Sequence, residues 1–269
     1  MPDNLTALHR ETGRTWDVTA ALYERDEPRD IERLRAGWTS FLPAEEPLLR
    51  EYLPCGRALH LQCAGGVDTL SLWKLGARLV VGVDISERMI AVAKRKASAL
   101  GAPATFVACD VLDTPRSFDR TVNLLYTGKG ALPWMMDLDA WAAVVARLLA
   151  PNGHLFVHEG HPLDWVWDLE AEDYRLSERT GSYFQAEPVA DRNWPATADV
   201  VQARAASEDL HVHEHQWTLG QVVTAVAGAG LHVERLVEHP EPFWDQFPHL
   251  DTALTPRLPH SFTLIAKRG

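Results

Sequence analysis

The pattern of apolar and polar residues divides most of the chain after residue 56 into alternating short strands and helices. Apolar runs rich in β-branched residues predict five strands, at residues 57–62, 79–84, 104–109, 121–125 and 154–159. Apolar residues at helical spacing predict helices over 67–75, after Ser86 as an N-cap, and over 138–149. Strands that alternate with helices in this way are typical of crossover units that build a parallel sheet.

The alternation of strands and helices is interrupted once and then resumes, and the N-terminal segment is not part of it. We expect one domain with four parts: a helical N-terminal cap over 1–52, a ligand-binding core over 53–159, an insertion over 160–216 and a closing segment over 217–269. Within the insertion, residues 183–189 and 210–217 have strand character. In the closing segment, the apolar pattern predicts a helix over 219–227 and strands over 231–238 and 261–266.

Composition and charge narrow the possible functions. The 269 residues are 46% hydrophobic and 23% charged, as in an ordinary globular protein, and the net charge of -11 argues against a general nucleic-acid binder. Neither a signal-peptide pattern nor an apolar run of about 18 residues is seen, so we expect a cytoplasmic protein without a membrane span. The three cysteines are odd in number and lack paired spacing, so we expect reduced thiols.

Three successive predicted strands end in residues that suit adenosine. The first leads into a small-residue turn over 62–66, which lets a ligand approach the backbone closely. The second ends at Asp84, whose carboxylate can accept hydrogen bonds from both hydroxyls of a ribose. The third is followed by Asp110, whose carboxylate can accept from the exocyclic amine of adenine. Because the carboxyl ends of parallel strands share one edge of the sheet, these features together predict an adenosine site.

These segments resemble the motifs of the class I (Rossmann-like) S-adenosylmethionine (SAM)-dependent methyltransferases, with similarity to a bacterial subgroup of small-molecule type. The matching segments are LHLQCAGG (59–66), VGVDIS (81–86), FVACDV (106–111), FDRTVNLL (118–125) and LLAPNG (148–153). The resemblance implies an α/β, three-layer, Rossmann-like sandwich with a seven-stranded, mostly parallel sheet whose last strand is antiparallel. It also implies SAM as the cofactor.

The resemblance assigns a set of cofactor-binding positions in this chain. They are Gln62, Cys63, Ala64, Gly65, Gly66, Asp68, Asp84, Ile85, Met89, Asp110, Val111 and Tyr126. The chain departs from the family's first motif, because His60 stands where an acid is common and Gln62 and Ala64 replace two glycines. Ala64 can still lie near the ligand if its φ is negative, whereas Gln62 cannot adopt the backbone region reserved for glycine without strain.

The resemblance leaves little for a catalytic group to do. The sulfonium of SAM already activates the methyl group, so the protein mainly aligns a nucleophile and excludes water, and a general base is needed only for a protonated acceptor. The candidate bases follow the fourth and fifth strands: Tyr126, Glu159 and His161. We place His161 first, with a purely structural histidine as the equal alternative.

The acceptor is expected to be a small molecule, apolar or aromatic. The sequence around Tyr126 lacks the motif that marks many DNA and protein amine methyltransferases, and tryptophans are frequent in the cap and the insertion. Candidate acceptor-binding residues are Trp16, Trp165, His215 and Trp217. The alternating His211, His213 and His215 lack the convergence of a metal site, so no metal is expected.

Two other functions fit parts of the pattern. The substituted positions 62 and 64 are compatible with a SAM-binding protein that has lost catalysis. An NAD-dependent oxidoreductase would share half of the fold, but no G-x-G-x-x-G sequence follows the first predicted strand. Neither the methylated atom nor the oligomeric state can be read from the sequence.

Overall fold

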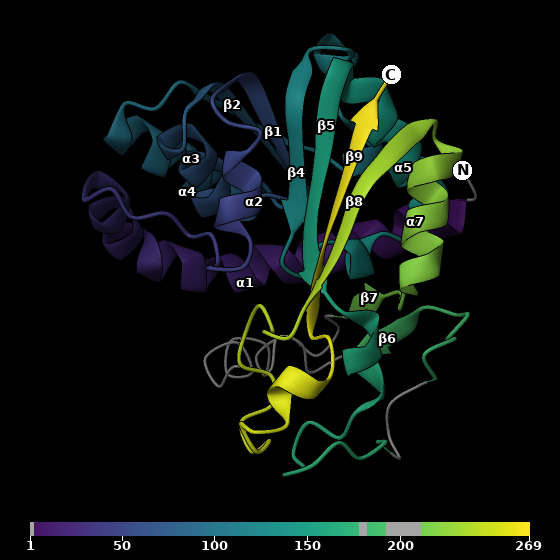
Figure 1. Ribbon diagram of the computed structural model, residues 1–269. Coiled ribbons are helices and arrows are strands. Elements are labelled where there is room, and N and C mark those ends of the chain that lie inside the picture. Colours follow the sequence, from purple (N-terminus) through teal and green to yellow (C-terminus); the bar gives the residue numbers. More distant parts are fainter. Residues whose placement is uncertain (1–2, 178–181, 192–210) are drawn as a thin grey trace.

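A seven-stranded sheet forms the centre of the molecule (Figure 1). The computed structural model describes residues 3–177, 182–191 and 211–269. The strand order is β3-β2-β1-β4-β5-β9-β8. The strands are β1 Cys55–Leu61, β2 Ala77–Asp84, β3 Ala104–Ala108, β4 Val122–Gly128, β5 Leu149–Gly160, β8 Leu231–His239 and β9 Ser261–Arg268. Strands β1 to β5 pair in parallel and β9 pairs antiparallel with both β5 and β8, which confirms the expected sheet.

Helices cover both faces of this sheet, so its central strands are buried on both sides. The helices are α2 Glu46–Arg50, α3 Val67–Lys74, α4 Glu87–Leu100, α5 Leu138–Leu148 and α7 Leu219–Gly228. Leu59 and Leu61 pack into a core with α5 and α7, whereas Ala58, which precedes Leu59, belongs to the core on the α2 and α3 side. The alternation of side chains along a strand therefore explains why β1 is apolar at nearly every position.

Local signals in the sequence define several element ends. The Ser86 hydroxyl accepts a hydrogen bond from the Met89 N–H at 3.1 Å, which confirms Ser86 as the cap of α4. The fifth strand is longer than predicted. It extends back to Leu149 because that residue pairs with Val122 before a shift in register, and Asn152 turns the chain with a φ of 61°.

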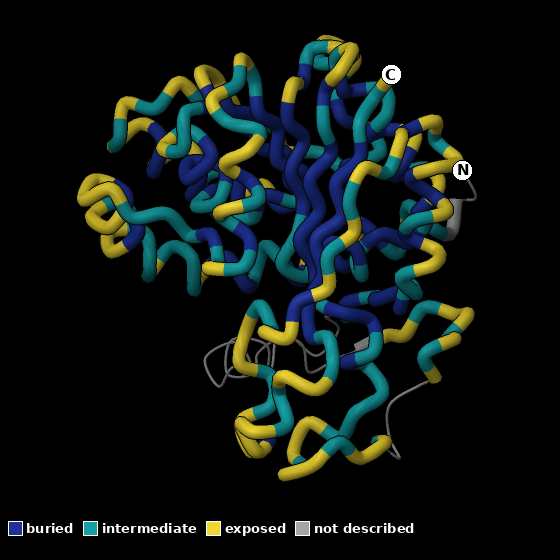
Figure 2. Tube along the Cα trace, in the orientation of Figure 1, coloured by how far each residue is buried: buried dark blue, intermediate teal, exposed yellow. Residues whose placement is uncertain are grey.

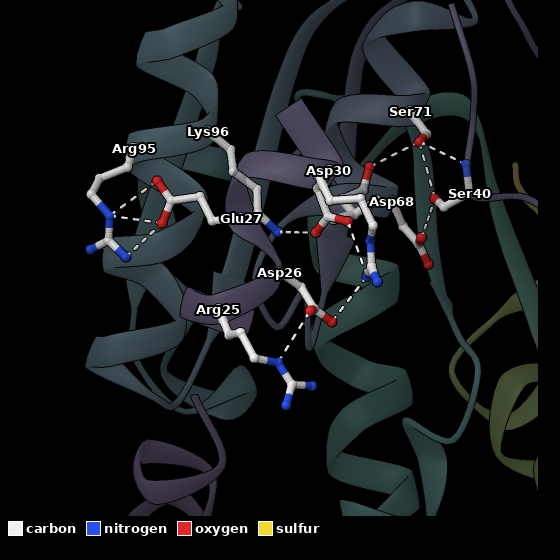
Figure 3. Close-up of polar contacts among 11 residues, drawn as sticks. Arg25, Asp26, Glu27, Asp30, Ser40, Asp68, Ser71, Arg95 and Lys96 are labelled. Atoms are coloured by element: carbon white, nitrogen blue, oxygen red, sulfur yellow. Dashed lines mark hydrogen bonds and ion pairs between the residues drawn. The ribbon is translucent and has the colours of Figure 1, made fainter. Parts of the chain in front are cut away.

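A long helix, α1 (Asp3–Arg35), lies outside the sheet and runs past the carboxyl ends of its strands (Figure 1). Its contacts with α4 include ion pairs between Arg95 and Glu27 (2.7 Å) and between Lys96 and Asp30 (2.7 Å), drawn in Figure 3. Lys96 is fully buried, so Asp30 supplies the charge partner that a buried ammonium requires. These contacts fix α1, which together with α2 makes up the expected helical cap.

A second, more exposed lobe lies below the same edge of the sheet (Figure 2). It combines part of the insertion with the segment between β8 and β9, a contribution that the sequence pattern did not predict. The expected strand over 183–189 is wrong for its first six residues, since β6 is only Val189–Asp191. Within the expected strand over 210–217, β7 is Val212–Glu214, and Leu210 lies outside the described residues.

The lobe is held to the sheet by a buried histidine. His260, which precedes β9, is fully buried and contacts Asp164 through Nδ1 (2.8 Å) and the Tyr174 hydroxyl through Nε2 (2.6 Å). Asp164 also accepts a hydrogen bond from Gln246. One histidine therefore connects the two segments that make the lobe.

Candidate active site

A cavity of about 270 Å³ lies between the carboxyl ends of β1 to β4 and helix α1. Four groups of residues line it: the loop after β1, the residues after β2 and β3, the loop after β4 and one face of α1. They are His60, Gln62 to Asp68, Asp84, Ile85, Asp110, Val111, Gly128 to Ala131, Trp134 and Met135, with His9, Thr12, Trp16 and Tyr23 from α1. The predicted edge of the sheet therefore carries the cavity.

The loop after β1 keeps a left-handed backbone although two of its positions are not glycine. Gln62 has a φ of 57° and Ala64 a φ of 43°, so Ala64 lines the cavity although its φ is positive. Each such residue costs about 1 kcal/mol relative to glycine. The Gln62 side chain compensates by donating to the carbonyl of Ala131 at 2.6 Å, which joins the loops after β1 and β4.

The two glycines at the end of this loop are required for packing. A Cβ on Gly66 would lie 2.6 Å from the Cβ of Ala93, and one on Gly65 would lie 2.9 Å from the Tyr23 ring. Gly66 also has a φ of 77°. The start of α3 can thus approach both α4 and the cap only because these positions lack side chains.

Asp84 lies at the end of β2 with its carboxylate fixed by two backbone donors. The Ser86 N–H donates to Oδ1 at 2.9 Å and the Ala64 N–H donates to Oδ2 at 2.8 Å. Burial raises the pKa of Asp84 to about 6, against these hydrogen bonds, which lower it. A carboxylate has about four acceptor positions and the Ile85 backbone also donates to Asp84, so this cavity-lining group keeps an acceptor position for a ligand.

Asp110, after β3, is held in a similar way by a backbone group and by the cap. Its Oδ1 accepts from the Leu112 N–H at 2.9 Å, and its Oδ2 lies 2.6 Å from Nδ1 of His9. Asp110 and His9 both line the cavity. The predicted adenine acid is therefore in contact with a residue of α1, a contact that the sequence did not suggest.

Lys129 and Asp68 form the polar end of the cavity. The Lys129 ammonium contacts the Asp68 carboxylate at 2.9 Å and the Ser40 carbonyl at 3.0 Å, and lies 3.6 Å from Glu45. Burial lowers the pKa of Lys129, but the two carboxylates outweigh it and raise the pKa above its usual value. Asp68 in turn accepts from the Ser40 hydroxyl, which also contacts Ser71 (Figure 3).

Two of the predicted cofactor positions do not line the cavity. Met89 is fully buried in α4. Tyr126 is fully buried on the α2 and α3 side of the sheet, where its hydroxyl donates to Glu45 Oε1 at 2.5 Å. The phenol of Tyr126 thus binds within the protein, because a tyrosine buried among apolar side chains needs a partner for its hydroxyl. The other predicted cofactor positions are among the lining residues.

Glu159 binds backbone groups instead of facing the cavity. Its Oε2 accepts from the Gly130 N–H at 2.7 Å, and its Oε1 accepts from the N–H groups of Ala131 (2.7 Å) and Leu132 (2.9 Å). Burial raises the pKa of Glu159 to about 7, although these backbone hydrogen bonds lower it. The carboxylate therefore shapes the loop after β4, which lines the cavity.

His161, the first candidate base, also lies outside the cavity lining. Its Nε2 is 3.0 Å from Glu238 of β8, and its Nδ1 accepts from the Leu163 N–H at 3.1 Å. Burial lowers the pKa of His161, while Glu238 raises it. Both ring nitrogens thus have partners at the start of the insertion, the arrangement of the structural alternative.

The predicted acceptor-binding residues divide into one that lines the cavity and three that do not. Trp16 of α1 lines it and packs edge-to-face on Trp134, with ring centroids 5.7 Å apart. Trp217 and His215 stack on each other and contact the backbone on both sides of Trp134. The Trp217 Nε1–H donates to the Met135 carbonyl (2.9 Å), and the His215 N–H donates to the Pro133 carbonyl (2.7 Å). Trp165 is not among the lining residues.

Sequence reasoning missed a whole wall of the cavity. His9, Thr12, Trp16 and Tyr23 lie on one face of α1 at helical spacing, but only Trp16 was singled out. The spacing was a signal that these residues share a face. Which face meets the site depends on how α1 packs on α4, which the spacing does not reveal.

Comparison with known proteins supports the resemblance of the core to methyltransferases. Residues 58–153 match the family model described as a methyltransferase domain. Over 104 residues the chain is 28% identical to a ubiquinone biosynthesis O-methyltransferase of Rhizobium rhizogenes. That alignment covers 38% of this chain and 40% of the relative, so the chain matches about two fifths of that protein's length.

Solved structures extend the similarity in fold over most of the chain. A SAM-dependent methyltransferase from Mesorhizobium loti aligns with a TM-score of 0.57 at 23% identity, over 84% of this chain and 98% of that one. Geranyl diphosphate C-methyltransferase from Streptomyces coelicolor aligns with a TM-score of 0.55 at 17% identity, over 83% and 76%. Residues 58–153 therefore match a methyltransferase-domain family, and the chain has the fold of these SAM-dependent methyltransferases.

Proposed function

We propose that this chain transfers the methyl group of SAM to a small-molecule acceptor, with Asp84 and Asp110 holding the adenosine part of the cofactor. The observation that carries the proposal is the pair of carboxylates on successive strand ends, both lining one cavity beside the loop after β1. The O-methyltransferase relative and the C-methyltransferase structure support the reaction class. Because those two names differ in the atom methylated, the acceptor atom is left open.

The residues present fit SAM. Both carboxylates have at least one donor on each oxygen from the protein, and each keeps an acceptor position for a hydroxyl or amine group of a nucleoside. The loop after β1 brings backbone rather than side chains to the cavity wall, because Gly65 and Gly66 have none. At the other end, Asp68 and Lys129 offer one charge of each sign to a zwitterionic amino acid group.

SAM, when bound, supplies a methyl group activated by its sulfonium. An acceptor lone pair aligned by the site would take this methyl group, and the electrons of the carbon–sulfur bond would remain on sulfur. The chain's contribution is to orient and enclose: Glu159 shapes the loop after β4, and Trp16 with Trp134 forms an apolar wall that excludes water. Tyr126, Glu159 and His161 are engaged within the protein, so the proposed mechanism assigns none of them a proton transfer.

The aromatic wall favours a small acceptor with an apolar or flat surface. The cavity of about 270 Å³ is slightly smaller than the usual small-molecule site, which spans roughly 300 to 1,000 Å³. It would be filled largely by the cofactor, so the acceptor is expected to enter where α1, the loop after β4 and the insertion meet.

Calorimetric titration of the chain with SAM, and separately with NAD, tests the proposal. SAM should bind with a dissociation constant below about 1 mM and NAD should not. Asp84→Asn should weaken SAM binding about 30-fold, through loss of charge-assisted hydrogen bonds worth about 2 kcal/mol. Asp113→Asn, which changes an exposed acid in the next loop, is the matched control and should bind like the wild type.

Absence of SAM binding by the folded wild type would overturn the proposal. Equal losses in the two variants would remove Asp84 from the site. Methyl transfer itself is then sought with SAM and a panel of small aromatic and isoprenoid acceptors, with production of S-adenosylhomocysteine as the readout.

A further inference from the structure

Helix α1 reaches the adenine side of the cavity through a single histidine. His9 is 6% exposed and contacts two groups that belong to different parts of the fold. Its Nδ1 is 2.6 Å from Asp110 Oδ2, and its Nε2 is 3.1 Å from the backbone nitrogen of Met136. The ring thus bridges the residue after β3 and the loop after β4.

The hydrogen bonds determine which ring nitrogen carries the proton. A backbone N–H can only donate, so Nε2 of His9 must be the acceptor from Met136. The proton of the neutral ring is therefore on Nδ1 and is donated to Asp110. With Leu112 N–H on the other oxygen, both oxygens of Asp110 are fixed and the plane of the carboxylate is set.

We infer that His9 is a positioning residue for the cofactor, which orients Asp110 to read the exocyclic amine of adenine. The inference rests on the proposed function. A carboxylate held by only one donor rotates about its last side-chain bond, whereas two donors from opposite sides leave its remaining acceptor positions pointing in fixed directions. Since a hydrogen bond to a ligand is lost when the acceptor points elsewhere, the preference for an amine depends on His9.

The same ring links adenine recognition to the wall on the acceptor side. Met136 directly follows Met135, which lines the cavity together with Trp134, and Trp134 packs on Trp16 of α1. His9 therefore holds the adenine acid on one nitrogen and the end of the aromatic wall on the other. Its two roles belong to different ring atoms and can be separated by substitution.

Asparagine and glutamine make this separation. An asparagine amide places a donor near the position of Nδ1, so His9→Asn retains the hydrogen bond to Asp110 and gives up the one from Met136. A glutamine reaches the position of Nε2, so His9→Gln retains an acceptor for Met136 and gives up the donor to Asp110. The control is His213→Ala, which removes a different histidine–carboxylate contact made by α1 (His213 to Glu11, 2.8 Å) away from the cavity lining.

The readout is the ratio of dissociation constants for S-adenosylhomocysteine and for its deaminated analogue, in which inosine replaces adenosine. The analogue has a carbonyl where adenine has its amine. The wild type should prefer S-adenosylhomocysteine at least tenfold, and His9→Gln should reduce this preference to below threefold. His9→Asn and His213→Ala should retain it, because both leave a donor on Asp110.

The outcomes distinguish this inference from the proposed function. If the wild type binds neither compound, the proposed function fails. If the wild type discriminates and His9→Gln does so equally well, His9 only anchors α1 and the inference fails alone. It fails too if the wild type binds both compounds equally, or if His213→Ala lowers the preference as much as His9→Gln does.

Discussion

The two halves of the sheet edge use their polar residues in different ways. At the ends of β2 and β3, Asp84 and Asp110 line the cavity and keep acceptor positions for a ligand. In β4, at the end of β5 and just beyond it, Tyr126, Glu159 and His161 have their polar atoms bound within the protein. Both halves offer polar residues near strand ends, but only the first turns them toward the cavity.

The difference shows that a place at the carboxyl end of a strand is not sufficient for a role in the chemistry. Whether a residue can act on a ligand depends on the direction of its side chain and on whether it already has a hydrogen-bond partner within the protein. The Glu159 carboxylate accepts hydrogen bonds from three backbone N–H groups, and the Tyr126 hydroxyl donates to Glu45. Neither side chain is therefore directed at a ligand. The second half therefore shapes the wall of the site, whereas the first half places its carboxylates in the cavity lining.

Removal of the Glu159 carboxylate should have the largest effect on stability. Glu159→Ala leaves three N–H groups of the loop after β4 without their acceptor, and we expect the free energy of unfolding to fall by about 3 kcal/mol. Urea denaturation measures the change. Asp113→Ala, which removes an exposed carboxylate, should change the free energy of unfolding by less than about 0.5 kcal/mol.

A direct role of Glu159 in catalysis would break the comparison. If Glu159→Ala folds with nearly wild-type stability but loses methyl transfer entirely, Glu159 belongs with Asp84 and not with the residues that shape the wall.

Tyr126→Phe should separate stability from binding. The change removes the donor to the buried Glu45 carboxylate, at a cost of about 1.5 kcal/mol in the free energy of unfolding. SAM affinity should stay within twofold of the wild type, since the hydroxyl does not line the cavity. A tenfold loss of affinity in calorimetry, with stability unchanged, would move Tyr126 into the cofactor site.

The pH dependence of stability gives the sharpest view of the buried carboxylate. Burial raises the pKa of Glu159 from 4.5 to about 7. Between these values the folded protein holds a proton that the unfolded chain has released, so this group lowers the free energy of unfolding as pH rises from 4.5 to 7. Position 159 cannot titrate in Glu159→Gln. The free energy of unfolding of this variant should therefore fall less steeply with pH than that of the wild type, by about 1 kcal/mol per pH unit.

The control for this measurement is internal. Burial lowers the pKa of His60 to about 4 and that of His158 to about 3, so these two groups raise stability as pH rises through the acid range. Their contribution is the same in the wild type and in Glu159→Gln and cancels in the difference. Parallel curves for the two proteins from pH 4.5 to 7 would show that Glu159 is already ionised throughout that range.

The half of the sheet edge formed by β1 to β3 was largely predictable from local sequence. The order of strands and helices, the Ser86 cap and the positions of Asp84 and Asp110 follow from periodicity and from motifs within about 60 residues. These signals are readable because each depends on neighbours in the chain: side chains alternate along a strand and recur every 3.6 residues along a helix. The turn at 62–66 was located correctly, but its left-handed backbone at Ala64 was not.

The acceptor side was decided by contacts between distant parts of the chain. His9 meets Asp110 across 101 positions, and Trp217 meets Met135 across 82. No local pattern predicts which face of α1 packs on α4. Nor does any local pattern predict that the Tyr126 hydroxyl binds Glu45 within the protein. The sequence by itself determined the sheet and the acids at its edge, because those follow from local periodicity. Only the tertiary structure decided which polar groups remain available, because a buried group binds whichever partner the packing brings within reach.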